Sequence, residues 1–201
     1  MKTGITTILF AMVITITLAG CGGAVKYPNY YTLQVPPPPD PPMASGVHAS
    51  LAVREFREPS YIREGAIVYK TSPEQIGFYN YHRWAVDPRE FVTNAVEDRL
   101  SASGNFARVK LYDGHSDIDF VLSGSLEKLE EIDYDGGVKV EVAISAQMVR
   151  LSTGETVWTN SVSEFGTVTK RDVPAIVAEM NRTMDRAIQK LLTPAPAVTT
   201  K

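Results

Sequence analysis

Strict alternation of apolar residues between positions 138 and 148 constrains the fold of this chain more than any other feature. Every second residue there is apolar: Val138, Val140, Val142, Ile144, Ala146 and Met148. Because successive side chains of a strand point to opposite faces, the pattern predicts one long strand with a single buried face. Turn sequences precede it at Gly136-Gly137 and follow it at 152–155. With flanking strands at 120–134 and 156–165, the pattern predicts a three-stranded antiparallel meander.

Shorter patterns predict the remaining elements. The alternation within 120–134 slips near Leu126, which indicates a β-bulge. Further strands are expected at 30–34, 47–56, 66–69, 75–79 and 107–112. Apolar residues at helical spacing after Asp87 and after Asp172 predict two amphipathic helices, each capped by its aspartate, with Glu90 completing a capping box at the first. The expected fold class is α+β: a mostly antiparallel sheet with two amphipathic helices packed on one face.

Cys21 is the only cysteine and ends the sequence Leu18-Ala19-Gly20-Cys21. An uncharged, mostly apolar stretch of about 14 residues precedes it and follows Lys2, which is typical of a secretory signal and shorter than the roughly 20 residues that span a bilayer. A cysteine at the first mature position can carry lipid. We expect a lipoprotein signal peptide at 1–20, with diacylglycerol and an N-acyl chain on Cys21. A retained membrane helix and a signal peptide with an incidental cysteine are the alternatives.

The expected lipidation has consequences for compartment and stability. With its one cysteine used, the chain has no internal disulfide, so packing alone must hold the fold in an oxidising periplasm. Gly22 follows the cysteine, where Asp would retain a lipoprotein at the inner membrane under the common sorting rule, so we expect an outer-membrane lipoprotein that faces the periplasm. The formal net charge of −3 gives no electrostatic reason to bind nucleic acid.

The expected organisation is one domain behind an anchor. Residues 21–29 are expected to be a lipidated tether and 30–193 the folded domain, in which the Pro-rich segment 35–46 is a stiff connector. Residues 194–201 are expected to be a flexible tail.

Catalytic and metal-binding signatures are weak. The loop from Asp113 to Asp119 contains His115 and several acids, but its spacing matches no calcium loop, and a polar loop is the favoured interpretation. Ser123-Gly124-Ser125 lacks the pattern of a nucleophile elbow. The acidic run 127–135 is expected to be a solvated strand face. We therefore expect neither an enzyme nor a metal site, and no cofactor besides the covalent lipid.

An aromatic cluster is the candidate contact site. Its members are Phe78, Tyr79, Tyr81 and Trp84, four aromatic residues within seven positions. At least half should be core, because aromatic side chains pack well on a pleated surface. We assign Trp84 to the core, with a surface anchor for a partner as the alternative. Tyr79 and Tyr81 are the candidates for contact with a partner or with acyl chains.

Four segments, in this order, carry a resemblance: Tyr30–Leu33, Ser72–Tyr79, Tyr81–Pro88 and Phe120–Leu126. They resemble the ABC-type transport auxiliary lipoproteins, the lipoprotein partners of bacterial lipid transporters that carry MCE (mammalian cell entry) proteins, as in the paraquat-inducible system. The most specific part is Trp-Ala-x-x-Pro at 84–88. The long Pro-rich insert and the acidic run depart from the family's pattern.

The resemblance implies a non-enzymatic periplasmic component that helps to move phospholipids between the inner and outer membranes. It implies an MCE-domain protein as partner and, through it, an inner-membrane permease and an ATPase. Direct binding of phospholipid and a homo-oligomer are left open. The alternative is a structural envelope lipoprotein that tethers a complex without handling lipid, and a weaker third is a periplasmic hydrolase.

Overall fold

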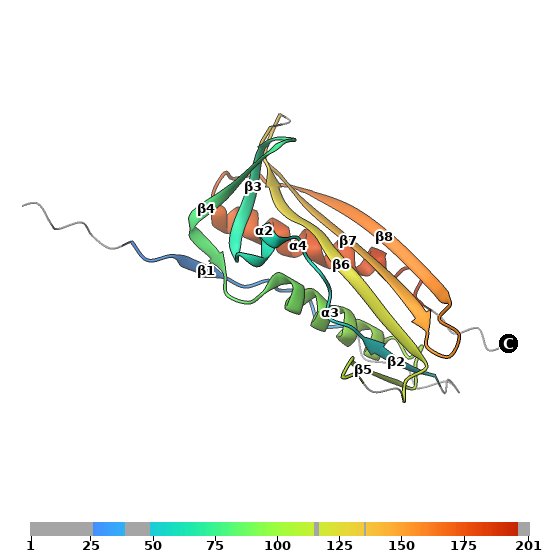
Figure 1. The fold of residues 1–201 in the computed structure, drawn as a ribbon. Helices are drawn as coiled ribbons and strands as arrows, with labels where there is room; N and C mark the ends of the chain where they lie inside the picture. Colours follow the sequence, from blue (N-terminus) through green and yellow to red (C-terminus); the bar gives the residue numbers. More distant parts are fainter. Residues whose placement is uncertain (1–25, 39–48, 115–116, 135, 197–201) are drawn as a thin grey trace, which may run out of the picture.

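A mixed eight-stranded sheet with two long helices forms the fold (Figure 1). The computed structural model describes residues 26–38, 49–114, 117–134 and 136–196. In chain order the elements are β1 (Asn29–Tyr31), β2 (Ser50–Val53), α2 (Ser60–Arg63), β3 (Ala66–Ser72), β4 (Gln75–Trp84), α3 (Pro88–Ala102), β5 (Arg108–Leu111), β6 (Phe120–Ile132), β7 (Lys139–Arg150), β8 (Thr156–Thr167) and α4 (Val173–Leu191). Within those ranges no helix is both long and apolar enough to cross a bilayer.

β6 is the strand on which the sheet is assembled. β7 pairs with it antiparallel along its whole length, and β8 pairs antiparallel with β7, so the predicted meander is confirmed. The other edge of β6 is shared, because β2 pairs in parallel with its first residues and β3 in parallel with its last ones. β4 then adds to β3 antiparallel, and β1 adds to β4 in parallel. The mostly antiparallel α+β class is confirmed.

A bulge in β6 explains why its alternation slips. The pairing with β7 shifts register between Leu126 and Lys128, so one extra residue stands on β6. Before the bulge, Leu122 and Leu126 point into the buried cluster beneath the helices, and after it Leu129 does so. The bulge therefore keeps apolar side chains on the helix-covered face at both ends of a 13-residue strand.

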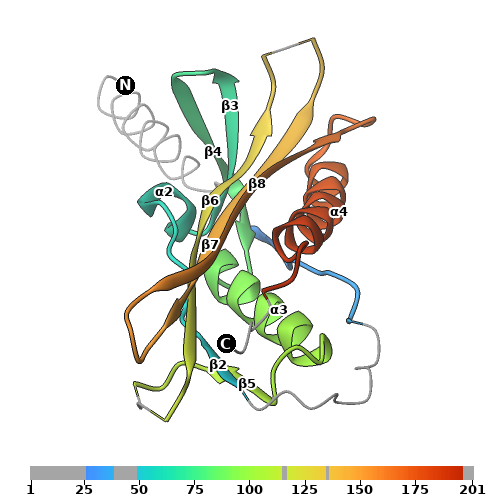
Figure 2. The same cartoon turned by 90° about the vertical axis from the view of Figure 1, so that its right-hand side faces the viewer.

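Both long helices lie on the same side of the sheet (Figure 2). α4 packs along β7 and β8 and buries the predicted apolar stripe, including Ile176, Met180 and Met184. Asp172 caps it by accepting a hydrogen bond from the Ala175 N–H at 2.9 Å. Asp87 caps α3 in the same way, but it accepts from the Arg89 N–H, also at 2.9 Å, rather than from that of Glu90.

Two glycines allow close contacts on the helix-covered face of the sheet. At Gly124 of β6, an added Cβ would lie 2.2 Å from Cε1 of Phe56 and 2.6 Å from the Ser145 carbonyl oxygen. At Gly166 of β8, it would meet the side chains of Glu179 and Thr183, so α4 packs directly on the backbone of β8. Both positions need glycine for space rather than for an unusual backbone conformation.

The segments around α2 and β1 differ from the expectations. The single-turn helix α2 was not predicted from the sequence. β1 ends at Tyr31, and the chain then crosses the helices, with Leu33 buried in the core and the Gln34 N–H donating to Asn181 Oδ1 at 3.1 Å. Of the predicted connector, residues 39–46 lie outside the described residues.

The start of the predicted flexible tail is held against β8. Trp158 Nε1 donates to the Pro194 carbonyl at 3.2 Å, and Pro196 is buried. Residues 197–201 lie outside the described ranges. An indole donor of β8 thus reaches the backbone at Pro194, and the boundary between domain and tail stays a prediction.

We expect Gly124→Ala to destabilise the fold by about 1–3 kcal/mol, because the new methyl group would meet both a buried ring and backbone. Gly137→Ala is the matched control, since nothing lies within 4 Å of its added Cβ. Urea denaturation of both variants would measure the free energy of unfolding. Equal stabilities would show that Phe56 does not pack against Gly124 as described.

Candidate functional site

Trp84 is part of the core and not of the surface. It ends β4 with 6% of its area exposed, in the same buried cluster as Ile67 and Val92. The backbone N–H of Trp84 donates to the Gly65 carbonyl at 2.8 Å, and its Cα partner in β1 is Tyr31. The predicted core role is confirmed, and this indole has little surface to offer a partner.

Tyr79 is half-buried and carries a structural hydrogen bond. Its hydroxyl donates to Glu131 Oε2 at 2.8 Å, and its ring packs on Tyr69 with centroids 5.0 Å apart. Burial and then the Glu131 carboxylate raise the pKa of the Tyr79 hydroxyl. Burial also raises the pKa of Glu131, although the Tyr79 hydrogen bond opposes that shift. This side chain is engaged inside the domain, which leaves it poorly placed for contact with a partner.

Tyr81 is exposed on the face of β4 opposite to that of the buried Trp84. Its ring lies under the ammonium of Lys26, with Nζ 4.4 Å from the ring centroid. Tyr27 and Tyr30 are exposed beside it on and before β1, and Phe78 is exposed on β4. Of the predicted contact residues, Tyr81 is the one that the fold leaves on an aromatic surface.

The acidic run 127–135 is not a solvated strand face throughout. Glu130 and Glu131 are 1% and 2% exposed. Lys70 Nζ of β3 lies 3.2 Å from Glu130 Oε1, and the Tyr79 hydroxyl of β4 donates to Glu131. The prediction is wrong for these two residues, because the β3–β4 hairpin supplies a cation and a hydroxyl that sequence spacing does not reveal. Glu127 is exposed as expected.

A second group of buried charges lies next to that pair. Glu141 of β7, directly opposite Glu130 in the register, accepts from Lys128 Nζ at 2.9 Å and from Ser163 Oγ at 2.8 Å. The hydrogen bond to Glu141 raises the pKa of the Lys128 ammonium. Each of these carboxylates thus has a partner within the domain.

Glu58 is a buried carboxyl without such partners. Its side chain has no exposed area, neither oxygen has a hydrogen-bond partner among the described residues, and Arg63 Nε is 3.8 Å away. The pKa of Glu58 is raised to about 7, first by burial and then by the Asp87 carboxylate, while Arg89 and Arg63 oppose the shift. A neutral, protonated Glu58 is therefore the form that the fold favours at acidic pH.

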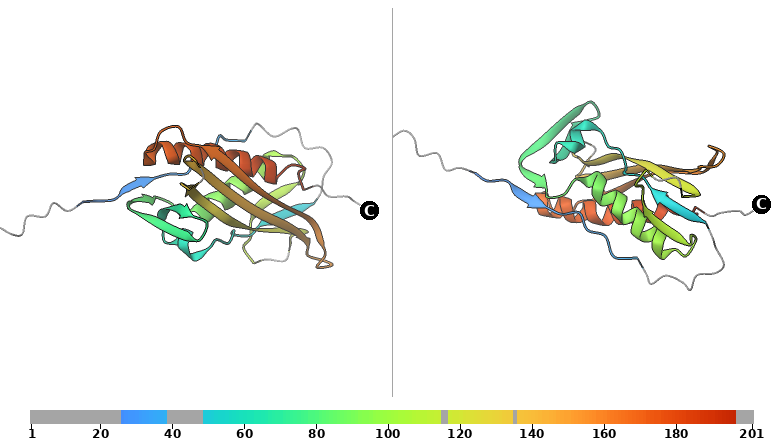
Figure 3. Two further views of the ribbon diagram at one scale, coloured as in Figure 1. Left: turned by 90° about the horizontal axis from the view of Figure 1, so that it is seen from above. Right: turned by 60° about the horizontal axis from the view of Figure 1, so that its bottom comes forward.

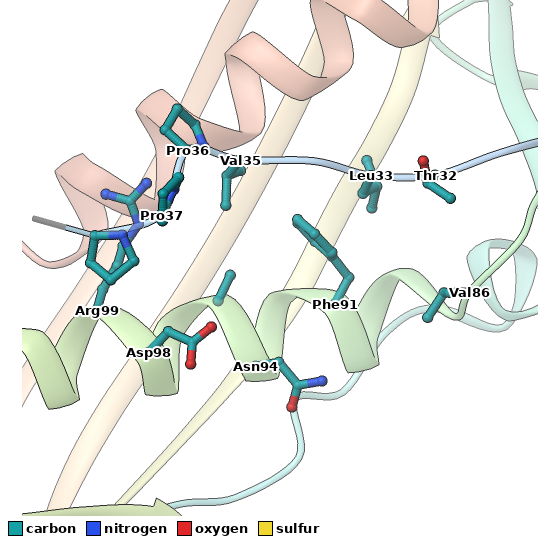
Figure 4. A pocket seen from close by; sticks show the side chains of 12 residues that line it. Thr32, Leu33, Val35, Pro36, Pro37, Val86, Phe91, Asn94, Asp98 and Arg99 are labelled. Atoms are coloured by element: carbon teal, nitrogen blue, oxygen red, sulfur yellow. The ribbon is translucent and has the colours of Figure 1, made fainter.

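A cavity lies between the segment after β1 and α3, with a volume of about 290 Å³ (Figure 4). Phe91 projects from α3 toward Leu33 and Val35, and Arg99 closes one end beside Pro36 and Pro37. The Arg99 guanidinium pairs with Asp185, but its Nε has no hydrogen-bond partner among the described residues. The volume is at the lower limit of small-molecule pockets.

The loop from Asp113 to Asp119 uses its acids for local pairing. Asp119 accepts from both the N–H and Oγ of Ser50 at 2.8 Å, and Asp117 pairs with Arg108 at 3.2 Å. Among the described residues no group of three or more His, Cys, Asp or Glu could hold a metal ion. His115 and Cys21 lie outside the described residues. Ser123-Gly124-Ser125 lies within β6.

Comparison with known proteins places this fold. A family model described as "ABC-type transport auxiliary lipoprotein component" matches residues 31–191, from the end of β1 to the end of α4. The chain belongs to this family. In sequence, no curated protein matches it at a significant level. The family resemblance in the sequence is thus confirmed.

Two solved structures share the fold at low sequence identity. Protein XCC0632 from Xanthomonas campestris, of family DUF330, has a TM-score of 0.70 at 17% identity, covering 82% of this chain and 92% of that one. An uncharacterized protein has a TM-score of 0.64 at 16% identity, covering 84% and 98%. Identities this low show a common fold and no more.

Sequence reasoning missed Tyr27 and Tyr30 as surface residues. From the sequence, Tyr27 was assigned to a tether and Tyr30 to a short strand. In the structure their side chains are 78% and 64% exposed. A usable signal was present, because the two tyrosines stand beside Lys26 and directly after the expected anchor, with no acid nearby. Nothing in the sequence indicated that Glu58 and Arg99 have buried polar atoms, since their burial depends on elements distant in sequence.

We expect Trp84→Ala to cost about 3–5 kcal/mol of stability, because it leaves a cavity in the core cluster. Tyr81→Ala is the matched control: its ring is exposed, so the melting temperature should change little. Thermal unfolding followed by circular dichroism measures both. A Trp84→Ala protein as stable as Tyr81→Ala would contradict the core role.

We expect Glu58→Gln to stabilise the protein at high pH and not at low pH. The folded-state pKa of about 7 lies above the ordinary 4.5, so ionisation costs the wild type stability progressively as pH rises from 4.5 to 7. Gln cannot ionise, and the gain above pH 7 should be about 2 kcal/mol. Urea unfolding at pH 5 and pH 8 tests this.

Glu155→Gln is the control for that titration, because Glu155 is exposed in the turn between β7 and β8. Its effect should not change between the two pH values. A Glu58→Gln effect that is equally pH-independent would mean that Glu58 is not a buried titrating group.

Proposed function

We propose that this chain is a membrane-anchored periplasmic lipoprotein that serves as a non-enzymatic auxiliary component of an MCE-type ABC lipid transporter. The observation that carries the proposal is the family match across residues 31–191, with Cys21 ten residues before its start. The family name supplies the association with an ABC transport system. The MCE-domain partner, the permease, the ATPase and the lipid cargo follow from the resemblance of the four sequence segments.

The anchor is a diacylglycerol thioether on Cys21 together with an N-acyl chain. The sequence Leu18-Ala19-Gly20-Cys21 and the apolar stretch before it support this assignment. Gly22 supports outer-membrane delivery. Two or more acyl chains give a stable anchor, which a single chain does not.

A non-enzymatic role agrees with how the polar groups of the domain are used. The buried carboxylates Glu131 and Glu141 bind a tyrosine, a lysine and a serine of the sheet, and the loop acids bind Arg108 and Ser50. These groups stabilise the fold.

The size of the cavity favours a second candidate, a lipoprotein that tethers the complex without binding lipid itself. The cavity beside α3 has about 290 Å³, and two others, beside Leu192 and beside Tyr112, have about 350 and 400 Å³, all at the lower end of small-molecule sites. Mass spectrometry of lipids that co-purify with the chain distinguishes the two: stoichiometric phospholipid supports lipid handling, and its absence from a complex that retains its partners supports tethering.

We expect Cys21→Ser to give an unprocessed precursor that accumulates at the inner membrane, because the serine hydroxyl cannot accept the diacylglycerol needed before cleavage. Intact-mass analysis and membrane fractionation measure processing and location. Ser123→Ala is a suitable control, since this substitution in β6 leaves the signal unchanged.

The same full-length chain, solubilised in mild detergent and affinity-purified from its own host, should retain an MCE-domain protein. Recovery of that protein with the acylated chain, and its loss with Cys21→Ser, is the expected result. An acylated chain that retains no MCE-domain protein under mild cross-linking would contradict the proposed transporter role. A Cys21→Ser chain that is still cleaved would contradict the lipoprotein assignment.

A further inference from the structure

Exposed aromatic residues gather at one edge of the sheet, around β1 and β4. Five of the ten exposed large apolar side chains among the described residues lie there. They are Tyr27, Tyr30, Ile76, Phe78 and Tyr81, and we call them, with Lys26 and Arg83, the aromatic edge. Figure 3 shows β1 at one end of the molecule and the β7–β8 hairpin at the other.

The pairing of β1 with β4 divides their side chains between core and surface. Tyr31 is opposite Trp84 and faces the core, and its hydroxyl lies 2.9 Å from His82 Nδ1. Tyr30 is opposite Arg83, so both point to the other face, away from α3 and α4. The exposure of Tyr30, 64%, is therefore a consequence of register and not of a frayed end.

The aromatic edge is basic on a protein that is acidic as a whole. Residues 26–35 and 75–84 contain Lys26 and Arg83 and no Asp or Glu, although the full chain has a net charge of −3. The closest acids along the chain are Glu74 in the β3–β4 turn and Asp87 after β4, which pairs with Arg89. Arg83 Nη1 donates to the Glu64 carbonyl at 3.0 Å. This edge is complementary to an anionic surface.

The anchor cannot be far from this edge. Five residue steps separate Cys21 from Lys26, and a fully extended chain of that length spans about 18 Å at most. Lys26 itself touches the Tyr81 ring. A lipid on Cys21 therefore holds Tyr27, Tyr30 and Tyr81 near the bilayer at high effective concentration.

Tyrosine and lysine or arginine are the side chains that suit a membrane interface. The ring of a tyrosine enters the headgroup layer while its hydroxyl stays hydrated, and basic side chains approach lipid phosphates. Each basic residue near an anionic leaflet adds to the electrostatic attraction. The aromatic edge combines three exposed tyrosines with two such cations.

We propose that the aromatic edge rests in the headgroup layer of the membrane that holds the Cys21 lipid, with its tyrosine rings at the interface and Lys26 and Arg83 on anionic lipid phosphates. The inference rests on the proposed acylation of Cys21. The inference goes beyond acylation by fixing the orientation of the domain: β1 and β4 lie against the bilayer, and the β7–β8 hairpin points away.

The test uses a unique cysteine, since the thiol of Cys21 is blocked by lipid. Full-length acylated Tyr30→Cys carries an environment-sensitive fluorophore and is reconstituted into phosphatidylethanolamine vesicles with or without phosphatidylglycerol. Leu151→Cys, exposed in the turn of the distant β7–β8 hairpin, is the matched control. Lipids with nitroxide groups and aqueous iodide are the two quenchers.

The expected result is a blue-shifted Tyr30 label that nitroxide lipid quenches and iodide does not, with a larger effect when phosphatidylglycerol is present. The Leu151 label should show the reverse. Adding Lys26→Glu to Tyr30→Cys should reduce the effect of phosphatidylglycerol. A Tyr30 label as accessible to iodide as the Leu151 label would overturn the inference, and so would a label shielded from both quenchers, because protein would then cover it.

Intact-mass analysis before reconstitution separates this inference from the proposed function. A chain without acyl groups would contradict the lipoprotein assignment and the orientation together. An acylated chain whose Tyr30 label stays in water would contradict the orientation alone.

Discussion

The pairing of β6 with β7 is the interaction on which the rest of the structure depends. Thirteen residues of β6 carry β7 on one edge and two separate strands, β2 and β3, on the other. That arrangement places α3 and α4 over one continuous apolar face, with Leu122, Leu126 and Leu129 of β6 beneath them. The bulge after Leu126 is essential, because without it one half of the strand would turn its leucines outward.

Buried charge is the second constraint on the sheet. Glu130, Glu131 and Glu141 come from neighbouring strands, and none is more than 6% exposed. Their partners Lys70, Tyr79 and Lys128 come from three different strands. Removing one partner would leave a desolvated charge, so each of these carboxylates depends on the side chain that pairs with it.

The sequence predicted what local pattern controls and missed what distant neighbours control. Alternation at 138–148 and the caps Asp87 and Asp172 gave strands and helices close to the observed bounds, because period and capping are short-range properties. The burial of Glu130 was missed, since it depends on Lys70, 60 positions earlier. Tyr81 was found at the candidate site, whereas Tyr27 and Tyr30 were missed because their exposure is set by the register of β1 against β4.

The short strand β1 determines how a pull on the membrane end of the chain reaches the domain. Residues 29–31 run parallel to 82–84, and the Ala85 N–H donates to the Tyr31 carbonyl at 2.8 Å. Tension along the strand axis loads these hydrogen bonds in shear, all at once, instead of unzipping them one by one. Leu33, buried just beyond, acts as a second stop before α3 and α4 bear load. Tension on the N-terminal segment is therefore carried by the pairing of β1 with β4 before it reaches α3 and α4.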